Sequence, residues 1–204
     1  MPLIKYNNQS LSSITALPSG VPSGKLKLIS SQTASNSASI SFTSGLTSTY
    51  KVYKFVFVNI DPVTDMADFS FNMSTDSGSN YNVAKTSTFF LAQHQGSTGS
   101  FGSLGYVTAY DLAQGTGFQR LTDALEVDVA SANMSGSLIL FNPSSTTYVK
   151  HFLYVDSEYG NDVFIVNSFV AGYGNTTSAV NAIQFKFDTG NFSGTIYLYA
   201  IDNS

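Results

Sequence analysis

Hydrophobic and polar residues alternate in short segments along most of the chain. In residues 68–74, for example, Phe69, Phe71 and Met73 alternate with polar neighbours, and residues 37–43 follow the same rule. A period of two is that of a β-strand with one buried face and one solvated face. The pattern therefore predicts half-buried strands rather than amphipathic helices.

About ten strands are predicted in this way, each of them short and bounded by Gly, Asn, Ser or Pro. The best helical candidate, residues 121–130, is interrupted by Val127 and Val129 at period two. Strands at hairpin spacing without intervening helices form antiparallel sandwiches or jelly rolls. The predicted strands lie at residues 25–31, 37–43, 50–60, 68–74, 84–91, 105–110, 136–141, 148–155, 163–171, 182–188 and 194–201.

Residues 50–60 differ from the other segments because they are apolar on both parities, with Val56 on one and Phe57 on the other. A strand that is apolar on both faces is expected to be central, lying between a core and another surface. The dipeptide Asp61-Pro62 is expected to end this strand, because proline cannot donate a hydrogen bond to a sheet ladder.

The length of 204 residues favours one domain, since β-sandwiches often reach this size as a single unit. Residues 1–48 are dominated by Ser, Thr and Leu. Their first half, residues 1–24, carries Pro18 and Pro22 and is expected to form an extended N-terminal arm. Residues 25–204 are expected to form the domain. The predicted fold is all-β, an antiparallel β-sandwich with the jelly roll as the favoured subtype.

Charged residues make up 11% of the chain, against roughly a quarter in an average soluble domain, and Ser, Thr, Asn and Gly replace them. Such a surface loses little desolvation energy when it is buried against another subunit, which suits a component of an assembly. Secreted β-proteins share this composition. The net charge of −4 argues against a nucleic-acid partner, whose binding depends on Lys and Arg neutralising phosphates.

Targeting segments, membrane spans and cysteines are further features that can be read from the sequence. The N-terminus has no basic region followed by an apolar one, and no apolar run approaches the roughly 20 residues of a membrane span. We therefore expect a chain made without a signal peptide and without a membrane span. The chain has no cysteine, which excludes disulfides, thiol nucleophiles and thiolate metal sites.

Candidate catalytic groups form no recognisable motif. Of the two histidines, His151 shares a strand face with Leu153 and is expected to be half-buried, whereas His94 lies between two glutamines in a predicted loop. Paired carboxylates for glycoside hydrolysis are conceivable, but no pattern selects a pair. Residues 76–80 superficially resemble a calcium loop and lack its terminal glutamate, so a plain turn is favoured. We expect a protein that is not an enzyme and has no cofactor.

A ligand, if there is one, is expected to contact the longest predicted exposed loop, residues 93–105, which carries four glycines. A flexible hairpin tip without a partner explains the same composition equally well. Sugars bind aromatic faces and amide groups, and tyrosines next to loops could supply them, although tyrosine is also an ordinary strand residue. The candidate ligand or host contacts are His94, Phe101, Tyr106 and Tyr110.

Several stretches spread over the chain carry a resemblance to a known group of proteins. They are residues 3–11 (LIKYNNQSL), 69–72 (FSFN) followed by 76–81 (DSGSNY), 141–147 (FNPSSTT), 171–177 (AGYGNTT) and 194–201 (GTIYLYAI). With these stretches the chain resembles virion structural proteins, decoration-like or fibre-like, of tailed bacteriophages of marine and freshwater bacteria. None of the stretches is a catalytic motif, and no catalytic residue is carried over from the resemblance.

The resemblance implies a protein made in the host cytoplasm and displayed on the particle surface. Proteins of this kind commonly form homotrimers. The leading expectation is a capsid decoration or cement protein that contacts the major capsid protein or other virion proteins, with the arm 1–24 lying across neighbouring subunits. The alternative is a tail-fibre or head-fibre adhesin that binds host-surface glycans through loop 93–105.

Overall fold

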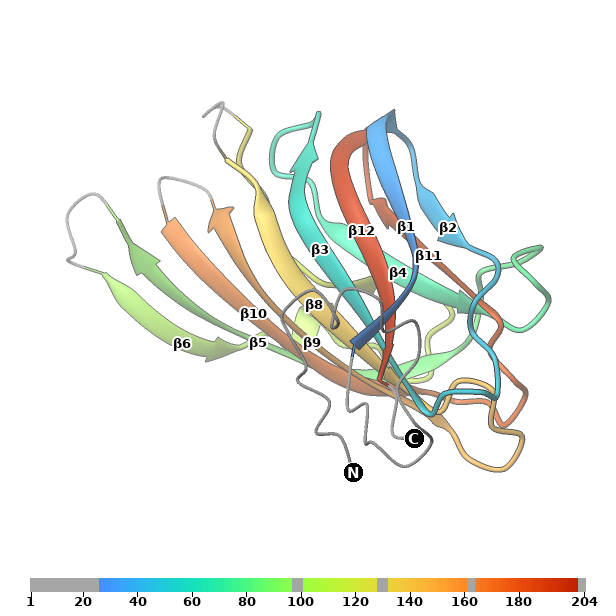
Figure 1. Cartoon of the computed structure of the whole chain (residues 1–204). Helices are drawn as coiled ribbons and strands as arrows, with labels where there is room; N and C mark the ends of the chain where they lie inside the picture. The colour runs from blue at the N-terminus through green and yellow to red at the C-terminus, as the bar shows by residue number, and fades with distance from the viewer. Residues whose placement is uncertain (1–25, 97–100, 128–131, 161–163, 202–204) are drawn as a thin grey trace, which may run out of the picture.

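The computed structural model describes residues 26–96, 101–127, 132–160 and 164–201. Within these residues the chain forms two antiparallel sheets, as the alternation predicted (Figure 1). The larger sheet has eight strands in the spatial order β1-β12-β3-β8-β9-β10-β5-β6. Their bounds are β1 Leu26–Ser37, β3 Val52–Pro62, β5 Lys85–Gln95, β6 Gly102–Tyr106, β8 Met134–Phe141, β9 Lys150–Gly160, β10 Phe164–Gly174 and β12 Phe192–Ile201.

The smaller sheet packs on one side of the larger one and has the order β2-β11-β4-β7. Its strands are β2 Ile40–Phe42, β4 Phe69–Ser74, β7 Gln119–Arg120 and β11 Ala182–Phe187. Because it has four strands against eight, it does not cover the larger sheet completely. In Figure 1 the strands β10, β5 and β6 extend beyond it.

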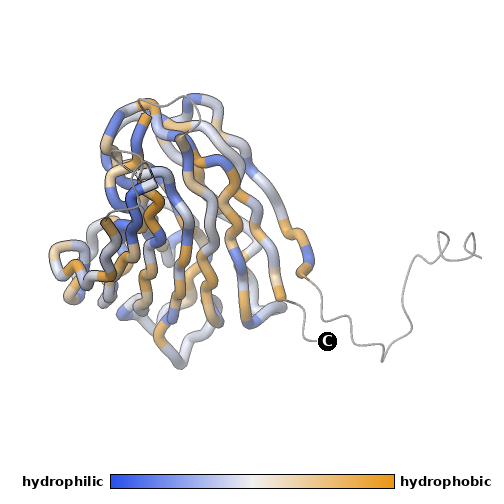
Figure 2. The backbone as a smooth tube through the Cα atoms, turned by 90° about the vertical axis from the view of Figure 1, so that its left-hand side faces the viewer, coloured by the Kyte–Doolittle hydropathy of each residue, from blue (hydrophilic) through white to orange (hydrophobic). Residues whose placement is uncertain are grey.

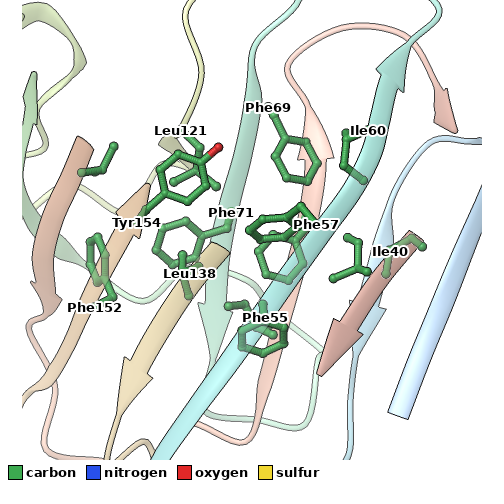
Figure 3. Packing of buried hydrophobic residues seen from close by; sticks show 14 of the residues in the cluster. Ile40, Phe55, Phe57, Ile60, Phe69, Phe71, Leu121, Leu138, Phe152 and Tyr154 are labelled. Carbon is green, nitrogen blue, oxygen red and sulfur yellow. The ribbon is translucent and has the colours of Figure 1, made fainter. Parts of the chain in front are cut away.

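An aromatic core fills the space between the two sheets (Figure 3). Phe55 and Phe57 of β3 point toward Phe69 and Phe71 of β4, and all four side chains are fully buried. Hydrophobic residues recur along the strands of the larger sheet, as the colouring of Figure 2 shows. Burial of these rings removes on the order of 150–250 Å² each from water and accounts for the pairing of the sheets.

Several strand boundaries differ from the predicted ones. β3 continues through Pro62, which lies opposite Phe192 of β12. Proline is accepted there because the ladder between β3 and β8 ends at Ile60, so the missing N–H faces no neighbouring strand. β1 is longer than predicted, and β7 was not predicted at all.

The predicted loop at residues 93–105 is also wrong in large part. β5 runs to Gln95 and pairs with β6, so most of this segment is a β-hairpin. The predicted strand at 105–110 is displaced, because Thr108–Tyr110 form a single 3-10 turn, η1. Residues 121–127, the described part of the helical candidate, contain no helix.

Other expectations keep their status as predictions. The arm at residues 1–24 lies outside the described residues, and the jelly-roll subtype stays a prediction. Across the described parts of the chain, no helix is both long and apolar enough to cross a membrane.

Candidate functional site

The side of the larger sheet that faces away from the smaller sheet is called the outer face here. Strand registers align its side chains in rows that cross the sheet. One row consists of Tyr197, Val56, Ser137, Val155, Phe169, Phe90 and Tyr106. The next consists of Tyr199, Lys54, Ile139, Leu153, Ala171 and Thr88.

The outer face is apolar and exposed. Leu153 is 50% exposed and Leu104 of β6 is 74% exposed. Phe90 and Phe169 stack with their ring centroids 4.9 Å apart and form one wall of a shallow groove of about 410 Å³. Lys54 is the one charged residue of the two rows, all of whose members are described. A contiguous apolar surface of this kind is typical of an interaction site.

β3 shows why the outer face differs from an ordinary solvated sheet face. The sequence predicted a strand covered on both sides, because it is apolar on both parities. Phe55 and Phe57 lie in the core, but Val56 is half-buried and Val58 is 36% exposed on the outer face. Half of the prediction is therefore wrong for the isolated chain, since Val56 and Val58 remain partly exposed.

A cleft of about 520 Å³ opens on the opposite side of the same sheet, at the edge of the smaller sheet. β5 and β10 supply its floor, and the segment around β7 supplies its wall. We refer to this space as the cleft. Its lining residues are Met66, Gln93, Phe101, Tyr110, Arg120, Asp123, Ala124, Phe164 and Val166. Its volume is within the roughly 300–1,000 Å³ of small-molecule sites.

Arg120 organises the wall of the cleft. Its Nη2 lies 2.6 Å from Asp68 Oδ1 and 2.9 Å from Asp123 Oδ1, and its Nε donates to the carbonyl oxygen of Thr122 at 2.8 Å. The guanidinium carbon lies 3.6 Å from the ring centroid of Tyr110. The Tyr110 hydroxyl donates to Asp123 Oδ1 at 2.8 Å. These contacts fix Arg120 and Asp123 in one orientation.

Two buried acids lie behind this wall. Glu158 Oε1 accepts a hydrogen bond from the backbone N–H of Asp123 at 3.1 Å and from Ser168 Oγ at 3.1 Å. Asp156 accepts from the backbone N–H of Ser168 at 2.7 Å and from the Tyr154 hydroxyl at 2.6 Å. A continuous polar chain therefore runs from the cleft into the core.

Burial changes the protonation of these acids. Desolvation raises the pKa of Asp156 to about 7 and that of Glu158 well above its ordinary value, because the charged form is costly in the core. The same effect raises the pKa of Asp68 to about 6, and the attraction of Arg120 offsets only part of it. Burial, with the hydrogen bond to Asp123 as the next cause, raises the pKa of Tyr110 to about 12, so this phenol stays a hydrogen-bond donor at neutral pH.

The structure separates the four predicted contact residues into two pairs. Phe101 and Tyr110 line the cleft. His94 and Tyr106 lie on the outer face, because they pair in the β5–β6 hairpin with Gly102 and Phe90, respectively. The Tyr106 hydroxyl also hydrogen-bonds to Asp111. A single contact site made by all four residues is therefore not formed.

Two other expectations are refined. His151 shares the outer face with Leu153 as predicted, but it is exposed rather than half-buried. Its ring centroid lies 5.7 Å from that of Tyr173. The Asp76 carboxylate accepts hydrogen bonds from Ser74 and Asn80, which is the geometry of the plain turn that the sequence favoured.

Gln93 belongs to the segment 93–105 that was expected to contact a ligand, whereas sequence reasoning missed Arg120 as a member of the cleft. No pattern along the chain connects Asp123 with Glu158, which the structure joins by a hydrogen bond. No family model matches the chain, and neither does a curated protein or a solved structure.

Proposed function

We propose that this chain is a non-enzymatic structural protein of a tailed-bacteriophage virion. In this proposal it is a capsid decoration or cement protein that assembles as a homotrimer on the particle surface. The sequence resemblance supports the virion setting, and the low charge supports an assembled state. The observation that carries the proposal is the apolar, exposed outer face of the larger sheet.

The size of the outer face fits a subunit interface. Seven strands at about 4.8 Å spacing make a surface roughly 30 Å wide, and a strand of about eight residues is roughly 27 Å long. The product is roughly 800 Å², similar to the ~800 Å² that one partner contributes to a single pairwise interface, and in a trimer each subunit would divide it between two neighbours. We therefore assign neighbouring copies of the chain as the occupants of the outer face.

The chemistry of the outer face also suits contact between copies. Lys54 is the one charge in its two central rows, so a neighbour brings little like-charge repulsion. The aromatic residues Phe90, Phe169 and Tyr106 belong to the residue types that are enriched at interfaces. Covering the outer face as a whole would also bury Val56 and Val58 of β3, as the two apolar parities of that strand predict.

The test is the oligomeric state of the purified chain and of a variant with a charge on the outer face. Leu153→Lys places an ammonium group at the centre of the face, where the side chain already points outward. We expect a trimer for the wild type and a monomer for Leu153→Lys by size-exclusion chromatography with light scattering. Thr177→Lys, at an exposed loop position, is the matched control and should remain trimeric.

A second readout addresses the particle. Capsids of the phage that encodes the chain, stripped of this protein, should rebind the wild type and Thr177→Lys and regain stability against heating. A wild type that is monomeric at high concentration and does not bind capsids would contradict the proposal. Cryo-electron microscopy then distinguishes many copies on the shell from a few copies at the tail.

The alternative function is a tail-fibre or head-fibre adhesin that binds host-surface glycans. The cleft favours it, because Phe101 and Tyr110, two of the predicted contact residues, lie there together. The same particle images test it, since an adhesin is expected at the tail or at a vertex. The two functions use opposite sides of the larger sheet and can be separated by variants.

A further inference from the structure

The cleft has the composition of a binding site rather than of a packing defect. It combines an exposed aromatic ring, Phe101, with polar groups that converge on one space of about 520 Å³. Phe101 is 47% exposed and is fixed by an edge-to-face contact with Phe164, with the ring centroids 5.7 Å apart. The ring thereby offers apolar surface to the cleft without a large loss of side-chain entropy.

Three polar side chains in the cleft retain unused hydrogen-bonding capacity. Asp123 uses Oδ1 for both Tyr110 and Arg120, and Arg120 uses Nη2 for both of its carboxylates. Within the part of the chain that the structure describes, Asp123 Oδ2, Arg120 Nη1 and the side-chain amide of Gln93 have no hydrogen-bond partner. They supply an acceptor, a donor and a group that does both.

Tyr110 has a different role from the stacking that its position suggested. One face of its ring is covered by the Arg120 guanidinium, and the ring makes a perpendicular contact with Phe89, with the ring centroids 5.0 Å apart. Arg120 therefore occupies a face of Tyr110 on which a ligand ring would otherwise stack. Instead Tyr110 positions Arg120 and Asp123, and Phe101 is the available aromatic platform.

The charge of the cleft selects among polar ligands. The Arg120 guanidinium is shared between Asp68 and Asp123, so the formal sum of the three groups is negative. An anionic ligand would meet this negative charge and be repelled by it. Carboxylate, guanidinium and amide groups around an apolar ring instead match the alternating hydroxyl groups and C–H faces of a sugar.

We propose that the cleft binds an uncharged saccharide, whose apolar ring face packs on Phe101 and whose hydroxyl groups hydrogen-bond to Asp123, Arg120 and Gln93. This inference deepens the adhesin alternative and is independent of the assembly proposal, because the cleft and the outer face lie on opposite sides of the sheet. It assigns Tyr110 as a positioning residue.

The test uses the full chain and saturation-transfer NMR with methyl glycosides of glucose, galactose, mannose and N-acetylglucosamine, together with glucuronic acid as an anionic probe. We expect saturation transfer to at least one uncharged glycoside and none to glucuronic acid. Phe101→Ala should weaken binding at least tenfold. Gln93→Leu, which keeps the side-chain size and removes the amide, should also weaken it.

Phe90→Ala is the matched control, since it removes a phenylalanine from the same hairpin on the outer face. It should leave glycoside binding unchanged, and Phe101→Ala should leave the oligomeric state unchanged. Absence of binding to all four uncharged glycosides, binding that survives Phe101→Ala, or preferential binding of glucuronic acid would each overturn the inference. None of these results would alter the outcome of the Leu153→Lys assembly test.

Discussion

Phe185 of β11 lies at the centre of the aromatic core. It is fully buried, and its ring contacts rings from both sheets at tilted, edge-to-face or stacked geometries. Because the interior is close-packed, no neighbouring side chain can move into the space that this ring occupies without breaking its own contacts. The rings around it are Phe42, Phe55, Phe57, Phe69 and Phe71.

Replacing this ring should be among the most damaging single changes in the chain. We expect Phe185→Ala to lower the free energy of unfolding by about 3–5 kcal/mol, the sum of lost burial and a residual cavity. Phe101→Ala removes a phenyl ring from an exposed position and should change the free energy of unfolding by less than about 0.5 kcal/mol. Urea unfolding followed by circular dichroism measures both, and equal effects would contradict the central role of Phe185.

Buried titratable groups give the stability an unusual pH dependence. Asp68, Asp156 and Glu158 have raised pKa values in the folded state, so the folded chain binds more protons than the unfolded chain between about pH 4 and pH 7. Stability therefore falls as pH rises through this window. Lys85 acts in the opposite sense, because desolvation lowers its pKa to about 7 while its unfolded value is near 10.4.

We accordingly expect the melting temperature to be higher at pH 5 than at pH 7, and to rise again between pH 7 and pH 10. Calorimetry across this range measures both limbs. Glu158→Gln replaces the acid with a neutral group of the same shape and should flatten the limb below pH 7. Lys85→Met should flatten the limb above pH 7. A wild-type melting temperature that rises steadily from pH 5 to pH 7 would contradict the raised carboxyl pKa values.

At the scale of the strand, close approach between neighbours constrains particular glycines. Gly172 of β10 lies between β9 and β5, and a Cβ added there would lie 2.5 Å from the carbonyl oxygen of Thr86 and 2.7 Å from Phe152 Cζ. Gly105 of β6 has no heavy atom within 4 Å of the same position. The two residues differ in crowding rather than in residue type.

The same substitution at these two glycines should therefore have different effects. Gly172→Ala is expected to destabilise the chain by about 1–3 kcal/mol, because the backbone of β5 must move away. Gly105→Ala is expected to be within about 0.5 kcal/mol of the wild type. Thermal unfolding of both variants checks this, and a neutral Gly172→Ala would show that the spacing of β5 and β10 is adjustable.

The sequence predicted most strands because they alternate and have one face in the core. It failed at the β5–β6 hairpin, where Gln93 and His94 lie on strands that extend beyond the smaller sheet and carry no apolar alternation. It could not predict the cleft. The lining residues come from segments as distant as Met66 and Phe164, and only the pairing of the strands brings them together.

At the scale of the whole molecule, the larger sheet has two sides with different chemistry. One side holds the core and, beyond the edge of the smaller sheet, the polar cleft. The other side is the apolar outer face, which an isolated chain exposes to water. A cleft on one side remains accessible while copies pack through the other. Attachment to a particle and recognition of a ligand are therefore compatible in one assembled protein.

The forces that stabilise the proposed assembly should be visible in its response to salt and temperature. The two central rows of the outer face contain a single charge, so salt can screen few charge–charge interactions there. Raising NaCl from about 0.05 to about 0.5 M should therefore leave the dissociation constant of the assembly almost unchanged. Burial of apolar surface weakens on cooling, so dissociation should be stronger at low temperature than at 25 °C. Sedimentation velocity at several salt concentrations and temperatures measures both effects. An assembly that salt dissociates would indicate ion pairs, and therefore contacts made by a surface other than the outer face.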